Sequence, residues 1–581
     1  NTNSTNAIIY DHLYHELEIF KNVADYQKES IPPVFENIDN TLLGVGSCYL
    51  KKMIETPTTD IKKLVNLQNQ IKQIKNPETL KQDLTVLQNL QPDVYWFWKK
   101  RDQETDRYLH QLFFEHPLLV KCNQSETILN LCSFYKIIYS PAMVIISPII
   151  CIISPFIISR YILRVPISFN EYCTSVLGNM VGRTGVIQFM GKKKKYIRIV
   201  QYLAIFFWFF SYFQGMYNSI HVARNTYRIH QSVHKHISKF SLFISRASEM
   251  YQKYHYLFPD KLLESEYQPF PQLQNSSSYQ SENCLWTNKG KLLIDFLYVS
   301  QNRDRSYPLF NFLGRLDALL SIQSLVNSPD YCFTDYLSGK KPQIVAHEIW
   351  HPSFSAKNMI KNDFTIGGKN PQNALITGPN AGGKSTFLKS LSISVLLSQT
   401  LGISAASSFS LTPFYFINTY LNIPDCKGKE SLFEAEMNRA YNHMKQVKNL
   451  RPDQFSFCIL DEIFNGTNPL EGISGAYAIA DGLGKLTHSI SLITTHFHQL
   501  STLEKDVSGN TEFKTKFKNY HIPIRVTNSD DIKYCYKITT GISNQLIALK
   551  LLAKKGFDPD IVQLAEDKCQ KLVESQNADK K

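Results

Sequence analysis

Apolar positions recur every three or four residues through most of the first 130 positions of the chain. This spacing places apolar side chains on one face of an α-helix, so it predicts a mainly helical N-terminal region. The spacing is clearest at Ile61, Leu64, Leu67 and Ile71. Charged helical sequence resumes after about residue 221, and a proline- and serine-rich stretch at 266–285 predicts a loop before a last helical block at 309–326.

From about residue 345 the pattern changes to short apolar runs that alternate with helical periods. Such alternation is typical of α/β domains, in which helices connect the strands of one sheet. The chain is therefore predicted to be multidomain, with a mainly α-helical N-terminal region followed by an α/β domain.

Two segments of the helical region carry no charged residue. The first extends from 137 to 159, and the second, which is rich in aromatic side chains, extends from 199 to 220. As a helix, each is long enough to cross a hydrocarbon core of about 30 Å. Pro141, Pro148 and Pro155 stand at regular intervals of about two helical turns in the first segment, which places them on one helix face. Membrane helices tolerate proline better than exposed helices do, so a membrane hairpin is one interpretation.

The connection between these segments, 160–198, carries eight basic residues and one acidic residue. The positive-inside rule would place this loop in the cytosol, and both flanking regions would then lie on the opposite side of the membrane, which conflicts with the chemistry expected of the α/β domain below. A re-entrant or interfacial insertion on anionic lipid avoids this conflict, as does a loop that binds nucleic acid. The remaining alternative is a pair of core helices in a lever domain or a subunit interface.

The overall composition favours an anionic partner. The 581-residue chain has a formal net charge of +13, which suits nucleic acid or a membrane surface. Its 11 cysteines include no C-x-x-C pair, so they indicate reduced thiols and neither a disulfide framework nor a zinc site. The chain begins at Asn1 and not at Met, which is compatible with a cleaved targeting segment. We expect a cytoplasmic or nuclear compartment that contains ATP, with membrane association as an alternative.

The strongest chemical signal is a glycine-rich stretch between an apolar run and a helical run. It consists of Gly378, Pro379, Asn380, Ala381, Gly382, Gly383, Lys384, Ser385 and Thr386. This is the phosphate-binding loop (P-loop) motif, in which backbone N–H groups and a helix N-terminus surround phosphate groups. Lys384 would neutralise the β- and γ-phosphates of ATP, and the Ser385 hydroxyl would bind Mg²⁺.

Two further predicted strand ends fit the same chemistry. A buried-strand pattern downstream of the loop leads to Asp461 and Glu462. Asp461 would hold Mg²⁺ through water, and Glu462 would orient or deprotonate the attacking water. A third apolar run ends at His496, and a histidine in that position would sense the γ-phosphate.

These residues resemble the MutS family of mismatch-repair ATPases. Its members carry the loop Gly-Pro-Asn-x-Gly-Gly-Lys-Ser-Thr, and residues 378–386 match it at every fixed position. Further matching stretches lie on both sides of this loop: Trp350-His351-Pro352, Asn362-Asp363, Ser431-Leu-Phe-Glu-Ala-Glu436-Met437, Asp461-Glu-Ile-Phe-Asn-Gly-Thr467-Asn468, Thr495-His496-Phe-His-Gln-Leu500, Phe517-Lys-Asn519-Tyr-His521 and Tyr536-Lys-Ile-Thr-Thr-Gly541. The resemblance implies an ABC-type P-loop ATPase that uses ATP and Mg²⁺ and acts on DNA.

The resemblance also implies roles for individual residues. Asn362 and residues 378–386 would contact the nucleotide. The stretch that begins at Ser431 resembles the signature loop, which reaches the γ-phosphate bound by the partner subunit. The chain is therefore expected to form a homodimer or a MutS-like heterodimer.

A weaker resemblance at 41–71 marks the start of the family's lever domain, with only a short stretch of chain before it. We therefore expect no mismatch-reading domain in this chain, and DNA binding that is not mismatch-specific. Phe169 and Glu171 share the letters of the family's mismatch wedge, but such matches arise by chance among 36 phenylalanines. The family's usual C-terminal Ser-Tyr-Gly-Ile is replaced by Ser543-Asn544-Gln-Leu546. With Phe464 and Asn468, this Ser-Asn pair resembles divergent MutS-related proteins that carry membrane segments.

The predicted organisation has five parts. They are a helical lever start at 1–135, the two charge-free segments with their basic connection at 136–222, a helical lever region at 223–340, the ATPase domain at 341–525, and its closing segment with terminal helices at 526–581. The predicted function is a nucleotide-switched dimeric clamp on DNA, in mismatch repair or recombination. The alternative is a membrane-associated scaffold or mechanical ATPase without a DNA function.

Overall fold

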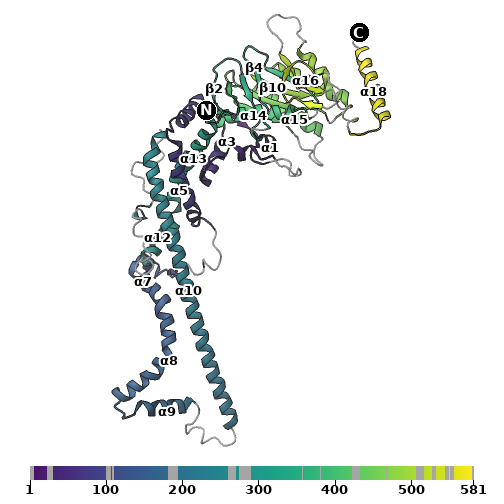
Figure 1. Ribbon diagram of the computed structural model, residues 1–581. Helices are drawn as coiled ribbons and strands as arrows, with labels where there is room; N and C mark the ends of the chain where they lie inside the picture. Colours follow the sequence, from purple (N-terminus) through teal and green to yellow (C-terminus); the bar gives the residue numbers. More distant parts are fainter. Residues whose placement is uncertain are drawn as a thin grey trace. The chain divides into compact units, whose positions relative to one another are not determined.

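The computed structural model divides the chain into two compact units, and Figure 1 labels some of their helices and strands. The first unit contains Asn1–Leu84, Leu257–Pro259 and Asn311–Lys581, and the second contains Thr85–Tyr256 and Asp260–Phe310. The structure describes residues 6–21, 31–99, 106, 110, 112–180, 194–258, 270–273, 289–355, 358–379, 381–421, 432–465, 467–504, 516–526, 532–543, 549, 552 and 555–578.

The second unit is built from helices. These are α7 (Glu126–Phe134), the π-helical turn η2 (Tyr135–Tyr139), α8 (Ser140–Ile157), the π-helical turn η3 (Ile158–Ile162), α9 (Phe169–Met180), α10 (Lys194–Tyr254) and α12 (Lys289–Gln301). The first four follow one another without a break, so the charge-free segment 137–159 is helical throughout. Pro148 and Pro155 lie inside α8.

The helix α10 is a single helix of 61 residues. It contains the second charge-free segment, 199–220, and continues through the charged sequence that follows. The sequence pattern therefore changes at about residue 222, whereas the helix does not end there. Beyond this point its apolar side chains form a buried stripe at helical spacing. The stripe includes Val233, Ile237, Phe240 and Ile244.

The helical part of the first unit joins segments that are far apart in the sequence. Its helices are α1 (Asp11–Glu16), α2 (Val34–Ile38), α3 (Gly44–Ile54), α4 (Ile61–Lys72), the first part of α5 (Pro77–Tyr95) and most of α13 (Tyr307–Val326). Asp317 of α13 is fully buried and accepts hydrogen bonds from the N–H groups of Leu42 at 3.0 Å and Leu43 at 2.7 Å. A carboxylate at this place satisfies N–H groups that α3 itself leaves unpaired.

The first unit also contains a seven-stranded sheet with the strand order β1-β8-β9-β10-β5-β11-β14. Its strands are β1 (Ile8–Ile9), β5 (Asn373–Thr377), β8 (Phe416–Tyr420), β9 (Ser456–Asp461), β10 (Ser489–Thr495), β11 (Phe517–His521) and β14 (Thr539–Thr540). Neighbouring strands are parallel except β11 and β14. The carboxyl ends of β5, β9 and β10 therefore meet, with Thr494 beside Asp461 and Thr495 beside Thr377.

Three helices accompany this sheet: α14 (Lys384–Thr400), α15 (Leu432–Lys448) and α16 (Pro469–Gly484). Leu375, Ile493 and Leu460 stand in one register row and belong to a buried cluster that also contains residues of α16. Because side chains alternate along a strand, this row faces one side of the sheet. The remaining elements are β2 (Cys332–Tyr336), β3 (Gln343–Ile349), β4 (Asn362–Gly367), β6 (Ile403–Ser404) and β7 (Ser408–Leu411) in a second sheet, the hairpin β12 (Ile524–Val526) and β13 (Ile532–Tyr534), and α18 (Pro559–Ala578).

A short strand near the N-terminus adds to the helical region that the sequence predicts. Ile8 and Ile9 form β1, which pairs in parallel with β8 at the edge of the seven-stranded sheet. The Ile8 N–H donates to the carbonyl oxygen of Tyr415 at 2.7 Å. The first residues of the chain are thus part of the same compact unit as the α/β region.

Candidate functional site

The glycine-rich loop lies between β5 and α14, as its motif requires. Gly383 caps the N-terminus of α14 with a left-handed φ of 96°. A Cβ atom at this position would lie 3.0 Å from the Tyr536 ring, so both the backbone conformation and the available space favour glycine. The first turn of α14 therefore begins beside the carboxyl ends of β5, β9 and β10, where its unpaired N–H groups can bind an anion.

Lys384 provides a buried positive charge, with 4% of its surface exposed. Its Nζ atom donates to the carbonyl oxygens of Gly378 at 2.9 Å and Pro379 at 3.2 Å. The same atom lies 3.1 Å from Glu462 Oε1. A buried ammonium group requires such partners, because an unpaired buried charge is strongly disfavoured. Its chemistry therefore fits the oxygen atoms of a phosphate group.

Ser385 and Asp461 bring a hydroxyl and a carboxylate together. The Ser385 hydroxyl donates to Asp461 Oδ2 at 2.6 Å, and the Thr494 hydroxyl donates to Asp461 Oδ1. Hard divalent cations prefer such oxygen ligands, and Mg²⁺ commonly takes only one or two from the protein and the rest from water and phosphate. The described residues contain no group of three or more His, Cys, Asp or Glu that could hold a metal ion without such help.

Glu462 is surrounded by groups that stabilise its ionised form. His496 Nε2 lies 2.7 Å from Glu462 Oε1, and the Asn465 amide donates to Oε2 at 3.0 Å. The hydrogen bond with His496, together with the Lys384 charge, lowers the pKa of Glu462 to about 2, although partial burial opposes the shift. Glu462 is therefore an ionised, oriented carboxylate at the mouth of the site.

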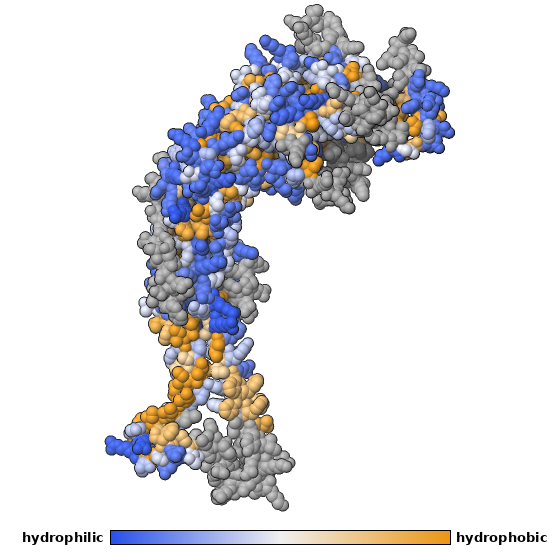
Figure 2. Space-filling model, in the orientation of Figure 1, coloured by the Kyte–Doolittle hydropathy of each residue, from blue (hydrophilic) through white to orange (hydrophobic). Residues whose placement is uncertain are grey.

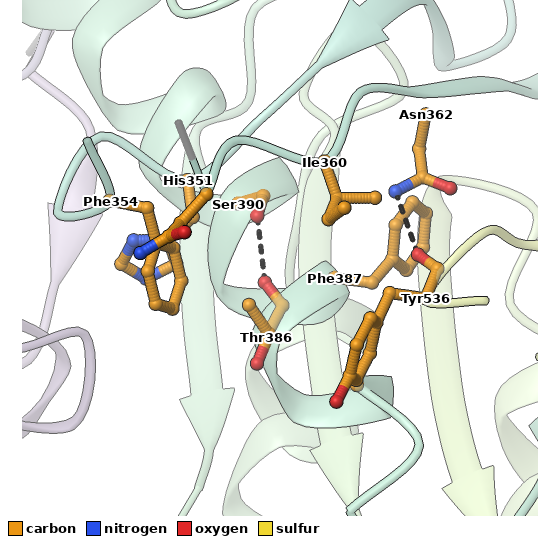
Figure 3. Close-up of a pocket in the computed structure, with 10 residues that line it drawn as sticks. His351, Phe354, Ile360, Asn362, Thr386, Phe387, Ser390 and Tyr536 are labelled. Atoms are coloured by element: carbon orange, nitrogen blue, oxygen red, sulfur yellow. Dashed lines mark hydrogen bonds between the residues drawn. The ribbon is translucent and has the colours of Figure 1, made fainter. Parts of the chain in front are cut away.

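A cavity of about 530 Å³ opens beside the first turn of α14 (Figure 3). It is lined by His351, Phe354, Asn358, Ile360, Asn362, Gly383, Thr386, Phe387, Ser390 and Tyr536. In Figure 3, Ile360 and Tyr536 lie on one side of Thr386, and His351 and Phe354 lie on the other. Burial lowers the pKa of His351 to about 3, so this ring is neutral. A volume of this size, with rings in its wall and a helix N-terminus at its base, suits a ligand with a flat apolar part and an anionic part.

Asn362 lines the cavity and also forms hydrogen bonds with the backbone of a neighbouring segment. Its amide donates to the carbonyl oxygen of Tyr536 at 3.3 Å, and its Oδ1 accepts from the Ile538 N–H at 2.8 Å. The side chain thus holds the segment of Tyr536 against β4 (Figure 3).

The structure brings most of the predicted site residues together. Lys384, Ser385, Asp461, Glu462 and His496 form one contact network, joined to the loop through Gly378 and Pro379. Gly382 lies in the loop, where its N–H donates to the Pro379 carbonyl at 3.2 Å, while Gly383, Thr386 and Asn362 line the adjacent cavity. Asn380 and Ser431 lie outside the described residues.

Sequence comparisons relate the region that carries the site to a known family. A family model described as MutS domain V matches residues 374–573, which contain the loop, the two adjacent carboxylates and His496. This region of the chain is thus similar to MutS-family proteins. The resemblance drawn from the motifs is thereby confirmed.

Individual relatives agree with this family, at modest identity. The chain is 29% identical over 274 residues to DNA mismatch repair protein MSH2 of Arabidopsis thaliana, an alignment that covers 45% of this chain and 28% of the relative. It is 24% identical to DNA mismatch repair protein MutS of Acetivibrio thermocellus, over 54% of this chain and 33% of the relative. It is 28% identical to Endonuclease MutS2 of Pediococcus pentosaceus, over 40% of this chain and 28% of the relative. The matches thus span about a third or less of these relatives' length.

Several contacts of the site have no counterpart in the sequence-based prediction. Thr494 and Asn465 bind the two adjacent carboxylates, and Glu436 accepts a hydrogen bond from the Phe464 N–H at 2.7 Å. The Tyr536 ring lines the cavity next to Gly383. The sequence carried one usable signal for these residues, because Asn465, Glu436 and Tyr536 lie inside stretches that match the MutS family and Thr494 directly precedes another.

Proposed function

We propose that this protein is a MutS-family, Mg²⁺-dependent ATPase with an ABC-type P-loop domain, and that it acts on DNA as a nucleotide-switched dimeric clamp. The observation that carries the proposal is the network of Lys384, Ser385, Asp461, Glu462 and His496 at one edge of a parallel sheet. These are the groups that phosphoryl transfer to water requires: a phosphate-binding cation, magnesium ligands and an oriented carboxylate.

Each group has a defined task in the proposed reaction. Lys384 would bind phosphate oxygens, and Ser385 and Asp461 would hold Mg²⁺, which would neutralise charge on the phosphates. Glu462 is ionised and therefore able to accept a hydrogen bond, or a proton, from the attacking water. His496 orients the Glu462 carboxylate through their 2.7 Å contact and is placed to respond to the γ-phosphate. The adjacent cavity would receive the base and sugar of ATP.

The proposal of DNA as the partner rests on the relatives and on charge. Two of the relatives described above are named as DNA mismatch repair proteins, and this chain has a formal net charge of +13. A basic protein gains affinity for DNA through release of counterions from the phosphates. A cytoplasmic or nuclear compartment, and a homodimer or a MutS-like heterodimer, belong to the same proposal.

The test is phosphate release from ATP by the purified protein, with and without Mg²⁺ and DNA, over a range of salt concentrations. We expect Mg²⁺-dependent hydrolysis that DNA stimulates at low salt, with the stimulation lost steeply as salt rises. Lys384→Ala should eliminate the activity, which excludes a contaminating ATPase. Wild-type protein without Mg²⁺-dependent hydrolysis would refute the enzymatic proposal, and hydrolysis that DNA never changes would refute the DNA partner.

A second candidate function, attachment to a membrane, is favoured by the apolar surface of the second unit. Among the described residues, two helical stretches are long and apolar enough to cross a membrane. The apolar window of Arg303–Val326 is 67% buried, which marks a core helix, whereas the apolar window of Glu126–Cys151 is 0% buried. Figure 2 shows apolar side chains gathered over α8 and the neighbouring stretch of α10. The exposed residues include Ile145, Ile149, Ile153 and Ile157 of α8 and Phe206, Phe207, Phe210 and Phe213 of α10.

We infer that lipid acyl chains cover these two helices, because water-exposed apolar patches of this extent are rare in soluble proteins. The test is flotation of the protein with lipid vesicles, with and without anionic lipid. Wild-type protein should float with the vesicles, and Ile149→Asp combined with Ile153→Asp should not, since a charge in the hydrocarbon core costs about 3 kcal/mol or more. The control is Val65→Asp, at an exposed apolar position of α4. Wild-type protein that does not float, or a double variant that floats equally, would refute the lipid surface.

A further inference from the structure

The N-terminal segment of the first unit follows the edge of the seven-stranded sheet. β1 pairs with β8, and α1 contacts the same strand. Glu16, the last residue of α1, is 3% exposed. Its carboxylate accepts hydrogen bonds from the Leu421 N–H at 2.8 Å and from Arg439 Nη1 at 2.7 Å. One buried carboxylate therefore joins the N-terminal segment to the end of β8 and to α15.

The helix α15 carries a second contact on the same face. Glu436 lies three residues before Arg439, and side chains at this spacing are neighbours on a helix. Glu436 Oε2 accepts a hydrogen bond from the Phe464 N–H at 2.7 Å, and the Phe433 ring lies 4.8 Å from the Phe464 ring between centroids. The helix α15 thus connects Glu16 with the turn that follows β9.

That turn contains Glu462 and has an uncommon backbone conformation. Glu462 and Phe464 have left-handed φ angles of 53° and 65°. Residues other than glycine keep this conformation only where surrounding contacts hold it. On one side, the Glu462 N–H donates to the carbonyl oxygen and the hydroxyl of Thr494, both at 3.1 Å. On the other side, Glu436 holds the Phe464 N–H.

We propose that Glu16 is a positioning residue for Glu462, acting through Arg439, α15 and Glu436. The proposal rests on the ATPase function proposed above and gives the N-terminal segment a part in it. Loss of the Glu16 charge leaves the Arg439 guanidinium without its buried carboxylate, which removes the anchor of α15 on the N-terminal segment. The contact of Glu436 with Phe464 then shifts, and the carboxylate that orients the attacking water moves with the turn.

The proposal predicts that Glu16 affects the position of Glu462 without affecting nucleotide binding. Among the described residues, the hydrogen bonds of Glu16 and Arg439 do not involve Lys384, Ser385 or the lining of the cavity. A shifted Glu462 should therefore lower kcat, while the KM for ATP and the affinity for nucleotide stay near the wild-type values. An ion pair with only a structural role would instead lower the midpoint of thermal unfolding and leave the kcat of the folded protein unchanged.

The first experiment compares Glu16→Gln with Glu55→Gln, which removes a carboxylate from an exposed ion pair at the end of α3. We expect kcat of Glu16→Gln to fall about tenfold, since small displacements of reacting groups have effects of this order or larger. Glu55→Gln should keep the wild-type kcat. Should Glu16→Gln fail to fold, Arg439→Lys, which keeps the charge but not the guanidinium, gives the same test with a smaller expected loss. An unchanged kcat in the folded variant would overturn the proposal.

The second experiment is a double-mutant cycle. Glu16→Gln and Glu436→Gln interrupt the same chain of contacts, so the double variant should lose little more kcat than either single variant. Exchange of the ion pair, Glu16→Arg with Arg439→Glu, should restore part of the lost kcat. Additive losses in the cycle would show that the two carboxylates act independently and would overturn the proposal. Wild-type protein without ATPase activity would instead refute the proposed function, so the two failures are distinguishable.

Discussion

Lys384 and Glu462 lie 3.1 Å apart, yet their charges serve different steps of the proposed reaction. Lys384→Ala should abolish hydrolysis and weaken nucleotide binding, because the buried cation is removed from the phosphates. Glu462→Gln should bind ATP with near wild-type affinity and lower kcat by about 10²- to 10⁴-fold, the usual contribution of a positioned base. Binding of a fluorescent ATP analogue and phosphate release, measured on both variants, check this split. Near-normal turnover by Glu462→Gln would remove this residue from catalysis.

At the scale of single residues, the sequence predicts those members of the site that are neighbours along the chain. Lys384 and Ser385 belong to one short motif, and Glu462 directly follows Asp461, so local sequence was enough to predict that they lie together. The contact of Glu436 with the Phe464 N–H depends on how α15 packs beside the end of β9. No local pattern specifies such a contact, because a glutamate on a charged helix usually faces water.

At the scale of elements, the strands that end in a recognisable motif could be predicted from the sequence. A strand without such a motif, such as β1, could not. β5, β9 and β10 appear as apolar runs that end in chemically distinctive residues. β1 has only two residues and depends on the exposed edge of β8 for its hydrogen bonds, so its sequence carries no strand period. The change from apolar to charged sequence at about residue 222 suggested a boundary, whereas α10 continues through it.

The contact between α3 and α13 predicts a pH-dependent stability. Burial raises the pKa of Asp317 from 3.8 to about 6, although the Leu42 and Leu43 N–H groups oppose the shift. Because the folded-state pKa exceeds the unfolded one, the folded state binds the proton more tightly. The stabilisation from this proton is therefore present below about pH 4 and lost as the pH rises through 6. The shift corresponds to about 3 kcal/mol over the whole window.

The measurement is the urea midpoint of wild-type protein and of Asp317→Asn between pH 4.5 and 7.5. Wild-type stability should decline relative to the variant as the pH rises to about 6.5 and run parallel to it above that value. Glu55→Gln, which removes an exposed carboxylate just after the end of α3, should follow the wild-type curve. Parallel curves for wild type and Asp317→Asn over the full range would show that Asp317 does not titrate in this window.

At the scale of the whole molecule, the first unit is formed by segments that are far apart in the sequence. Apart from Leu257–Pro259, the residues between Leu84 and Asn311 belong to the second unit. The hydrophobic pattern predicts helices before and after this inserted segment, but it does not reveal which of these helices pack together. The five-part division predicted from the hydrophobic pattern and the family resemblance followed changes along the sequence. The compact units instead follow contacts such as that of Asp317 with Leu43, 274 positions apart.

The last prediction concerns dimer assembly, and Ser431 allows a test of whether two subunits share one nucleotide site. Lys384 and Glu462 face each other within one chain, whereas the loop of Ser431, which immediately precedes α15, is predicted to complete the site of a partner subunit. Mixing Lys384→Ala with Ser431→Ala protein would then create hybrid dimers in which one site carries both defects and the other carries neither. Random pairing in a symmetric dimer should restore about a quarter of the wild-type activity from two inactive proteins.

Mixing Lys384→Ala with Glu462→Gln is the matched control for this experiment. Both of these residues act in the same site of the same chain, so every site in the hybrid keeps one defect and no activity should return. ATP hydrolysis after exchange of subunits, measured over a range of mixing ratios, distinguishes the cases. Recovery in the first mixture but not in the second would require a site shared between two subunits. If neither mixture recovers activity although the subunits have exchanged, Ser431 acts within its own chain, and the clamp would need another means of coupling its two nucleotides.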